Sequence, residues 1–360
     1  MIIAGGGTGG HLFPAVAVGE QIRRECSDAE ILHVGATNGM EARWFPTSGL
    51  RYELFPVSGF TGKDPLRRLR ALREFLSAVG RASRLVRSFH PDLVVSAGGY
   101  ASAPMAVAAI VRRTPLVLLE QNTRPGLANR VLWRFARKVC VGFSEAAAAF
   151  ATTKVEVTGN PVRFTAIPGP AKRPACPFQI LVLGGSTGAH RLNVGVLKAF
   201  TILGKTVIKL TIVHQTGEAD RAVVEERYQE LSCNARVSPF IDDVATALAR
   251  ADLVIARSGA MTVSELALAG RPAIFVPYPF HRDRQQEHNA GVIARLGGAT
   301  IIHDDEHLGE NLARELERLI ANPQCLVEMG QRAHQAAMPD AAKRIARVCF
   351  ETARPVEVRA

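Results

Sequence analysis

The stretch Met1-Ile-Ile-Ala-Gly-Gly-Gly-Thr-Gly-Gly-His11 decides how the chain folds. A short apolar run enters five glycines, a threonine and a histidine, and residues 12–18 continue as the start of a helix. Glycine adopts positive φ and lets the backbone approach a ligand closely. A glycine-rich turn between a strand and a helix therefore directs N–H groups and the helix dipole at an anion. We expect a diphosphate or pyrophosphate group to bind there.

Two other interpretations of this turn stay open. Gly5, Gly7 and Gly10 satisfy the G-x-G-x-x-G pattern of dinucleotide-binding sites, which also need an acidic residue at the end of the second strand. The second predicted strand, residues 30–34, runs into Gly-Ala-Thr-Asn and has no carboxylate at its end. The glycine pattern is therefore only weak support for an NAD(P)-binding site. A purely structural glycine turn is the other alternative.

The composition is that of a globular protein with an anionic partner. The 360 residues are 47% hydrophobic and 21% charged, which is enough chain for two domains with their own cores. The net charge of +11 suggests nucleic acid, a membrane surface or phosphorylated substrates. The six cysteines include no C-x-x-C pair, so the sequence indicates neither a disulfide framework nor a zinc site, and a reducing cytoplasm fits best. We expect no signal peptide and no membrane span, since no apolar run reaches about 18 residues.

Short β-branched runs alternate with helical patterns, which is typical of βαβ units and a parallel sheet. The predicted strands are residues 2–4, 30–34, 52–57, 92–96, 116–119, 138–141 and 155–158, then 178–183, 207–214, 235–237, 252–256, 272–276 and 299–302. A stretch rich in proline and glycine, 161–177, predicts a linker between domains 1–160 and 178–338. Residues 339–360 predict a final helix, with Asp340 as N-cap, that packs back toward the N-terminal domain.

The second half of the chain begins as the first does. Ile180-Leu-Val-Leu183 leads into Gly184-Gly-Ser-Thr-Gly-Ala189, which echoes residues 6–11. This repeat predicts an α/β protein of two Rossmann-like domains whose parallel sheets face a cleft. A ligand is expected outside the carboxyl ends of the strands.

Residues 256–265, Ala-Arg-Ser-Gly-Ala-Met-Thr-Val-Ser-Glu, carry the most specific binding signal. A strand gives way to a Ser-Gly turn and a helix, and the Glu265 carboxylate can accept two hydrogen bonds from the cis-diol of a ribose. The helix N-terminus and the loop with Ser186 and Gly188 can then hold phosphates. The alternative is that Glu265 only offsets the helix dipole.

Three other segments add polar chemistry near predicted strand ends. Gly98-Gly-Tyr100 makes a third glycine turn, for which a plain helix entry is the alternative. Gln285, Gln286 and Asn289 suit sugar hydroxyls, although a solvated helix start would look similar. The segment 303–307, His-Asp-Asp-Glu-His, looks metal-like but is interpreted as a polar turn, and no D-x-D motif supports a metal-bound diphosphate.

His11 is the candidate general base. It stands at a helix N-terminus, whose dipole favours a neutral ring that can accept a proton. Glu120-Gln-Asn122 ends another predicted strand on the same side of the sheet. A buried structural histidine is the alternative.

Residues 62–76 predict a basic amphipathic helix. Lys63, Arg67, Arg68, Arg70 and Arg73 interleave with Leu66, Leu69, Leu72, Phe75 and Leu76. Such a helix can lie on an anionic bilayer with its leucines inward. The alternative is an ordinary helix whose leucines pack on its own sheet, and both can hold.

These motifs together resemble the MurG family of peripheral membrane glycosyltransferases, and the match runs essentially end to end. The motifs that carry the resemblance are residues 6–11, 98–100, 120–122, 159–163, 184–189, 240–243, 257–265 and 283–286. The resemblance implies a GT-B fold of two Rossmann-like domains, with the donor bound mainly by the C-terminal one and no essential metal or other cofactor. Small departures are an extra residue near Pro279 and Met261 where leucine is common.

Matching positions imply which residues contact UDP-N-acetylglucosamine (UDP-GlcNAc). They are Thr8, Gly9, Gly10, Asn122, Arg163, Ser186, Ile241, Ala260, Met261, Thr262, Val263, Ser264, Glu265, Gln285 and Gln286. Ile241 would hold the uracil through its backbone. Gly98, Gly99 and Tyr100 would hold the acceptor's pyrophosphate, and residues 66–76 would face the membrane.

The resemblance implies an inverting transfer of GlcNAc from UDP-GlcNAc to the C4 hydroxyl of MurNAc in lipid I, giving lipid II for peptidoglycan. It also implies a place on the cytoplasmic face of the bacterial inner membrane, roles in cell shape and division, and cell-wall or divisome partners. The alternatives are a diacylglycerol glycosyltransferase, a UDP-GlcNAc 2-epimerase and a non-catalytic nucleotide-sugar sensor. Nucleic-acid binding is disfavoured, because only 6% of residues are aromatic and no such motif is present.

Overall fold

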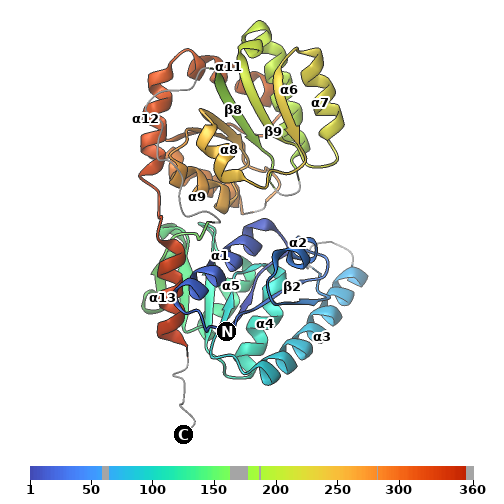
Figure 1. Cartoon of the computed structure of the whole chain (residues 1–360), viewed down its shortest axis with the longest axis vertical. Helices are drawn as coiled ribbons and strands as arrows, with labels where there is room; N and C mark the ends of the chain where they lie inside the picture. The colour runs from blue at the N-terminus through green and yellow to red at the C-terminus, as the bar shows by residue number, and fades with distance from the viewer. Residues whose placement is uncertain (59–64, 163–176, 186–187, 282, 354–360) are drawn as a thin grey trace. The chain divides into compact units, whose positions relative to one another are not determined.

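The computed structural model describes residues 1–58, 65–162, 177–185, 188–281 and 283–353. The chain divides into two compact units (Figure 1). Unit 1 comprises Met1–Arg163 and Asp340–Ala360, and unit 2 comprises Phe164–Pro339. Within the described ranges, no helix is long and apolar enough to cross a membrane.

Each unit is built on a parallel sheet. The sheet of unit 1 has seven strands in the order β3-β2-β1-β4-β5-β6-β7, and that of unit 2 has six in the order β10-β9-β8-β11-β12-β13. The strands of unit 1 are β1 Ile2–Ala4, β2 Leu32–Ala36, β3 Tyr52–Phe55, β4 Val94–Ser96, β5 Leu116–Glu120, β6 Lys138–Val141 and β7 Val155–Val157. Those of unit 2 are β8 Phe178–Leu183, β9 Leu210–Gln215, β10 Asn234–Ser238, β11 Leu253–Ala256, β12 Ala273–Phe275 and β13 Ala299–Ile301. The repeated order confirms the predicted α/β fold of two Rossmann-like domains.

Helices cover the sheets. Unit 1 has α1 Gly9–Glu25, α2 Glu41–Ser48, α3 Pro65–Phe89, α4 Gly99–Val111, α5 Leu127–Leu132 and α13 Ala341–Thr352, with 3₁₀ turns η1 Trp133–Phe135, η2 Ser144–Ala149 and η3 Thr152–Lys154. Unit 2 has α6 His190–Leu203, η4 Gly204–Lys209, α7 Arg221–Glu230, α8 Val244–Arg250, α9 Ala260–Ala269, α10 Gln285–Ala294, α11 Leu308–Ile320 and α12 Pro323–His334. The apolar side chains of each strand pack against these helices, as both-faced burial of a parallel sheet requires.

Two different helix layers bury the two faces of the unit 1 sheet. Core residues of α3, α4, α5 and η2 pack on one face, and those of α1 and α13 pack on the other. The last helix, α13, lies beside α1 (Figure 1) and buries Ile345, Val348 and Cys349. Arg347 of α13 also pairs with Glu156 of β7 at 2.6 Å. Helix α13 therefore belongs to the core of the unit that the N-terminus begins.

Most predicted strands differ from the observed ones by one to three residues at an end, and two of these differences have a clear structural reason. Residues 207–209 form the end of the 3₁₀ turn η4, and β9 begins only at Leu210. The chain turns at Gly204, which has φ 54°. Val207 is buried as a strand residue would be, but it lies in a helical turn. Likewise, Gly35 and Ala36 belong to β2 rather than to the following loop.

His33 of β2 is a buried, neutral histidine. Burial lowers the pKa of its imidazole from 6.5 to about 4, and the charge of Arg23 adds to the shift. Its Nδ1 has no hydrogen-bond partner among the residues that the structure describes, and its ring packs beside Phe45. Because the folded pKa lies below the unfolded one, the unfolded chain takes up the proton first. The stability from the neutral ring is complete above pH 6.5 and is lost as pH falls toward 4.

Between pH 7 and pH 5, the free energy of unfolding of unit 1 should fall by about 2 kcal/mol less in His33→Leu than in the wild type. Leucine fills a similar space without an unsatisfied nitrogen, so stability at pH 7 should change little. Trp44 and Trp133 are the chain's two tryptophans and both lie in unit 1, so their fluorescence during urea unfolding reports on this unit. An unchanged pH dependence in the variant would contradict the assignment.

Candidate active site

The candidate residues of unit 1 collect at one edge of its sheet. The glycine turn follows β1, Gly98 and Gly99 follow β4, and Gln121 follows β5. These three strands are neighbours, and parallel strands end at the same edge. The structure therefore brings His11, in the first turn of α1, next to residues more than 80 positions away in the sequence.

The contacts of His11 determine which ring nitrogen carries the proton. Its Nδ1 lies 3.0 Å from the carbonyl oxygen of Ala97 and 3.2 Å from Oε1 of Gln121. The Gln121 amide is oriented by its own Nε2, which donates to Ala97 O at 2.8 Å. Since both neighbours of Nδ1 are acceptors, Nδ1 must be the donor. The neutral ring then keeps its lone pair on Nε2, the atom that can accept a proton.

The glycine turn after β4 makes room for this ring at Gly99. Gly98 and Gly99 both have positive φ, 81° and 75°. A Cβ on Gly99 would lie 2.8 Å from Cδ2 of His11, which is closer than such atoms approach. Gly99 is therefore required by the position of His11, and Gly98 by its positive φ. Burial, with the charge of Glu41, raises the pKa of the neighbouring Tyr100.

Glu41 is a residue that the sequence interpretation missed. It is fully buried, and its two carboxylate oxygens accept from the Gly7 N–H at 2.9 and 2.8 Å, and one also from the Ala36 N–H at 2.7 Å. Side chains at Gly6, Gly35 or Gly39 would collide with it. The Gly7 N–H is therefore already bound to an anion within the protein, the Glu41 carboxylate. The anion-binding donors left to the turn are at Thr8, Gly9 and Gly10, where α1 begins.

Glu120 organises the other predicted segment of this edge. Its buried carboxylate accepts from the Asn122 N–H and from Nδ2 of Asn122 and Asn129, at 2.9–3.2 Å. The Gln121 carbonyl accepts from Nδ2 of Asn160 at 2.9 Å. The motif at 120–122 and that at 159–163 are thus joined by hydrogen bonds, although Arg163 lies outside the described residues.

In unit 2 the candidate donor-binding residues again stand at strand ends. Ala260, Met261, Thr262, Val263, Ser264 and Glu265 form the first six positions of α9. The side chain of Val263 is fully buried, so this position can reach a ligand only through its main chain. The first N–H groups of α9 point along its axis, as an anion site at a helix N-terminus requires.

The remaining donor candidates have the following places. Ile241 follows β10, and its N–H donates to Oε1 of Gln215 at 3.1 Å. Gln285 and Gln286 begin α10, and Oε1 of Gln286 accepts from the Tyr278 N–H at 2.9 Å. Ser186 lies outside the described residues.

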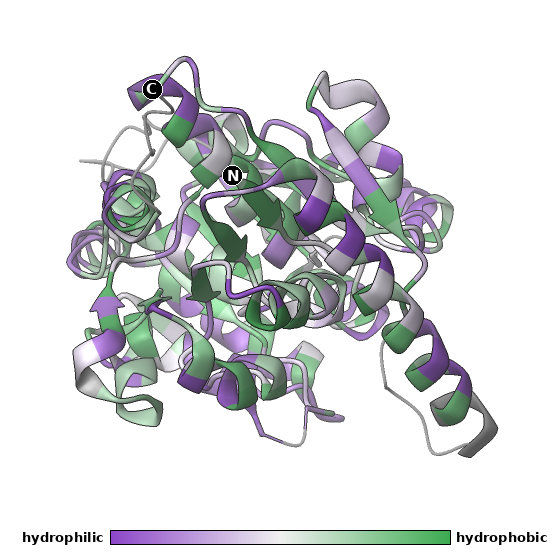
Figure 2. Ribbon diagram, turned by 90° about the horizontal axis from the view of Figure 1, so that it is seen from below, coloured by the Kyte–Doolittle hydropathy of each residue, from purple (hydrophilic) through white to green (hydrophobic). Residues whose placement is uncertain are grey.

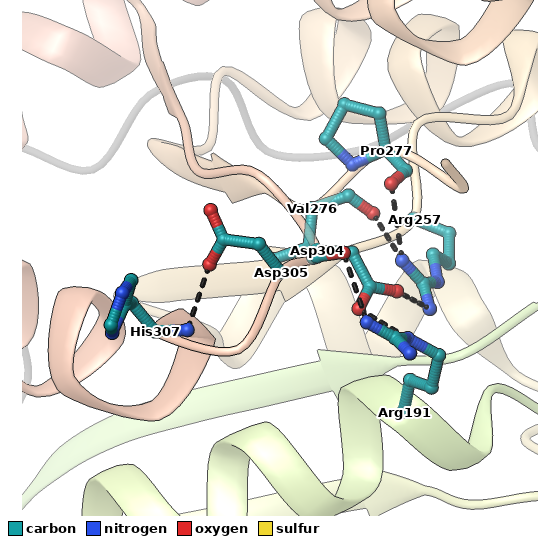
Figure 3. Close-up of polar contacts among 7 residues, drawn as sticks. All are labelled: Arg191, Arg257, Val276, Pro277, Asp304, Asp305 and His307. Carbon is teal, nitrogen blue, oxygen red and sulfur yellow. Dashed lines mark hydrogen bonds and ion pairs between the residues drawn. The ribbon is translucent and has the colours of Figure 1, made fainter. Parts of the chain in front are cut away.

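Asp304 is a second residue whose role was missed, within a segment interpreted as a polar turn. Its buried carboxylate pairs with Arg257 at 2.7 Å and with Arg191 at 2.7 Å (Figure 3). Arg257 also donates to the carbonyls of Val276 and Pro277 at 2.9 and 3.2 Å. Asp304 thus ties the ends of β11, β12 and β13 to α6. Asp305 does behave as a turn residue, since it accepts from the His307 N–H at 2.9 Å.

No metal cluster is evident in the described part of the chain. No group of three or more His, Cys, Asp or Glu side chains there is placed to hold a metal ion.

Helix α3 carries an exposed leucine stripe. Leu69, Leu72 and Leu76 are 49%, 45% and 60% exposed, whereas Ala71, Ala78, Ala82 and Val86 pack inward. The alternative, that the leucines pack on the unit's own sheet, does not hold for these three. Arg70, Arg73, Arg81, Arg84 and Arg87 are exposed along the same helix, where apolar and polar bands alternate (Figure 2). Phe75 is half-buried, and the side chains of Leu66, Arg67 and Arg68 lie outside the described set.

Comparison with known proteins identifies two family models. Residues 1–141 match the glycosyltransferase family 28 N-terminal domain, and residues 179–345 match the glycosyltransferase family 28 C-terminal domain. A relative from Syntrophotalea carbinolica is 42% identical over 350 residues, covering 97% of this chain and 98% of its own. One from Geotalea uraniireducens is 39% identical over 348 residues, covering 95% of each. Both are named UDP-N-acetylglucosamine–N-acetylmuramyl-(pentapeptide) pyrophosphoryl-undecaprenol N-acetylglucosamine transferase.

Solved structures show the same architecture. The crystal structure of Acinetobacter baumannii MurG superposes with a TM-score of 0.76 at 30% identity, over 98% of both chains. A UDP-GlcNAc 2-epimerase from Neisseria meningitidis superposes with a TM-score of 0.67 but is only 13% identical, over 97% of this chain and 98% of its own. The second likeness is one of fold alone.

We expect ¹⁵N NMR of the neutral imidazole of His11 to show a protonated Nδ1 and an unprotonated Nε2, because both neighbours of Nδ1 are acceptors. The spectrum of His11→Ala assigns the signals. His214 serves as an internal control of the opposite tautomer. Its Nε2 faces Asn193 Oδ1, and its Nδ1 accepts from the Tyr228 hydroxyl. Burial lowers the pKa of His214 to about 3, so it stays neutral throughout. An Nε2–H tautomer at His11 would contradict the geometry.

Proposed function

The chain belongs to the MurG family of glycosyltransferases, and on that premise we propose that it transfers GlcNAc from UDP-GlcNAc to the C4 hydroxyl of MurNAc in lipid I. The products are lipid II and UDP. The observation that carries the proposal is the nearly full-length similarity, at 37–42% identity, to relatives named as this transferase. The positions of His11 and of the α9 N-terminus are compatible with it.

The proposed chemistry is a single inverting displacement. Nε2 of His11 takes the proton of the acceptor hydroxyl, whose oxygen attacks the anomeric carbon as the bond to UDP breaks. The Nδ1–H of the ring remains bound to Ala97 O, so the positive charge formed on the imidazolium faces a carbonyl dipole. The result is a β-1,4 bond from an α-linked donor.

The leaving UDP acquires charge that the protein must stabilise. We assign this work to main-chain N–H groups of the α9 N-terminus and of the loop after β8, with Arg163 and Ser186 as further candidates. Glu265 is assigned to the ribose and Ile241 to the uracil. Since Oε1 of Gln286 accepts from Tyr278, its amide N–H group is oriented as a donor for sugar hydroxyls, together with Gln285. No step in this account needs a metal.

The acceptor side is assigned to unit 1. The α1 N-terminus and Gly98, Gly99 and Tyr100 would hold its pyrophosphate, and the polyprenyl chain would stay in the bilayer beside α3. This places the protein peripherally on the cytoplasmic face of the inner membrane. Cell-wall and divisome proteins are proposed partners there, as are roles in cell shape and division.

The function is tested by measuring UDP release from UDP-GlcNAc with and without a lipid I analogue, in EDTA. We expect release that depends on the acceptor and survives chelation. His11→Ala should lower turnover by about 10²–10⁴-fold, the usual contribution of a general base. UDP binding by calorimetry should stay at the wild-type level, because the assigned uracil and ribose contacts are in unit 2.

Three outcomes would contradict the proposal. UDP binding without release would indicate a sensor. Release only with a diacylglycerol acceptor would change the substrate class. Release only with added metal would show that the main-chain groups do not stabilise the leaving group.

We expect Leu69, Leu72 and Leu76→Ser to weaken sedimentation with anionic vesicles by about tenfold or more, because three exposed apolar side chains lose their place in the bilayer. The matched control replaces Val194, Ile202 and Val223 of unit 2, which are exposed to a similar extent, with serine. The control should bind vesicles as the wild type does. Equal loss in both variants would mean that α3 has no special part in membrane binding.

A further inference from the structure

Gln215 stands between two segments of unit 2 that are assigned to the donor nucleotide. It is the last residue of β9 and is 4% exposed. In the sheet, β9 lies between β8 and β10. The end of β9 is therefore flanked by the glycine loop after β8 and by the segment after β10 that contains Ile241.

The side chain of Gln215 joins these two segments. Its Nε2 donates to the Gly185 carbonyl at 2.7 Å, and its Oε1 accepts from the Ile241 N–H at 3.1 Å. A flipped amide would face oxygen to oxygen and N–H to N–H, so the contacts fix its orientation. One buried amide thus sets the direction of two peptide groups on opposite sides of β9.

The main chain around Gln215 reinforces this bridge. The Gly184 N–H donates to the Gln215 carbonyl at 3.4 Å, and the Gly217 N–H donates to that of Pro239 at 3.1 Å. A Cβ on Gly188 would lie 2.6 Å from the Thr216 carbonyl oxygen. Both segments therefore lie close against residues 215–217, and a change at Gln215 reaches both.

We propose that Gln215 is a positioning residue that couples recognition of the uracil to recognition of the diphosphate. The inference rests on the proposed function, in which the Ile241 main chain meets the base and the loop after β8 meets the phosphates. By holding the Ile241 N–H, Gln215 fixes the position of the Ile241 main chain, whose carbonyl is the acceptor that we assign to the base. Uracil presents an N–H at N3, whereas cytosine presents a lone pair there, so this carbonyl selects uracil.

The test compares affinity ratios, which a loss of folded protein does not change. Calorimetry gives the affinities of UDP, UMP and CDP for the full-length protein. In Gln215→Met we expect the preference for UDP over CDP and the advantage of UDP over UMP each to fall about fivefold, as for the loss of one hydrogen bond. Gln179→Met, a half-buried glutamine at the other end of the same sheet, should leave both ratios unchanged.

Two further variants keep the test decisive if the methionine variant folds poorly. Gln215→Asn keeps an amide but is too short to reach both partners, so both ratios should fall. Gln215→Glu keeps a full-length acceptor for the Ile241 N–H, so it should restore the preference for UDP over CDP. Wild-type ratios in Gln215→Asn and Gln215→Met would overturn the inference, as would loss of base preference in Gln215→Glu. A wild-type protein that does not bind UDP would instead overturn the proposed function.

Discussion

The parallel pairing of β1 with β2 and β4, and of β8 with β9 and β11, is the constraint on which both candidate sites depend. In each unit the first strand lies where the strand order reverses, and a glycine turn leaves its carboxyl end. Neighbouring strands then deliver their own following residues to the same edge. This is how His11 meets Ala97 and Gln121, and how Gln215 meets Gly185 and Ile241.

Behind each site, buried polar side chains fix the main chain. Glu41 holds the Gly7 N–H, Gln121 binds the Ala97 carbonyl, and Gln215 joins two peptide groups. A buried amide or carboxylate must satisfy its hydrogen-bonding groups, so it tolerates few backbone arrangements. Gln121 and Gln215 show the same device in both units, since each is a glutamine at a strand end that orients groups from a neighbouring connection. Loops without regular secondary structure gain a defined geometry in this way.

The fold was largely readable in the sequence, and the supporting contacts were not. Alternating β-branched runs located every strand of the two sheets to within a few residues, because burial on both faces leaves a local signature. The strand prediction was wrong for residues 207–209, because Val207 is buried from a 3₁₀ turn. A buried residue in such a turn gives the same apolar pattern as a buried strand. Glu41 and Asp304 were missed because their partners lie 34 and 47 residues away in the sequence. Such pairings are set by the order of the strands, which periodicity does not contain.

The net charge of +11 does not tell whether the basic residues bind the nucleotide or the membrane, but their positions in the structure do bear on this question. Arg257, in the most specific donor motif, is buried and neutralised by Asp304, which Arg191 shares. The Arg257 guanidinium is bound to Asp304 and to the carbonyls of Val276 and Pro277, so it is not available to a diphosphate. In the proposed reaction the leaving group therefore depends chiefly on main-chain N–H groups. The arginines of α3 are instead exposed beside Leu69, Leu72 and Leu76. Under the proposed function, main-chain N–H groups bind the nucleotide and the exposed arginines of α3 bind the membrane. Added salt should therefore weaken vesicle binding far more than donor binding.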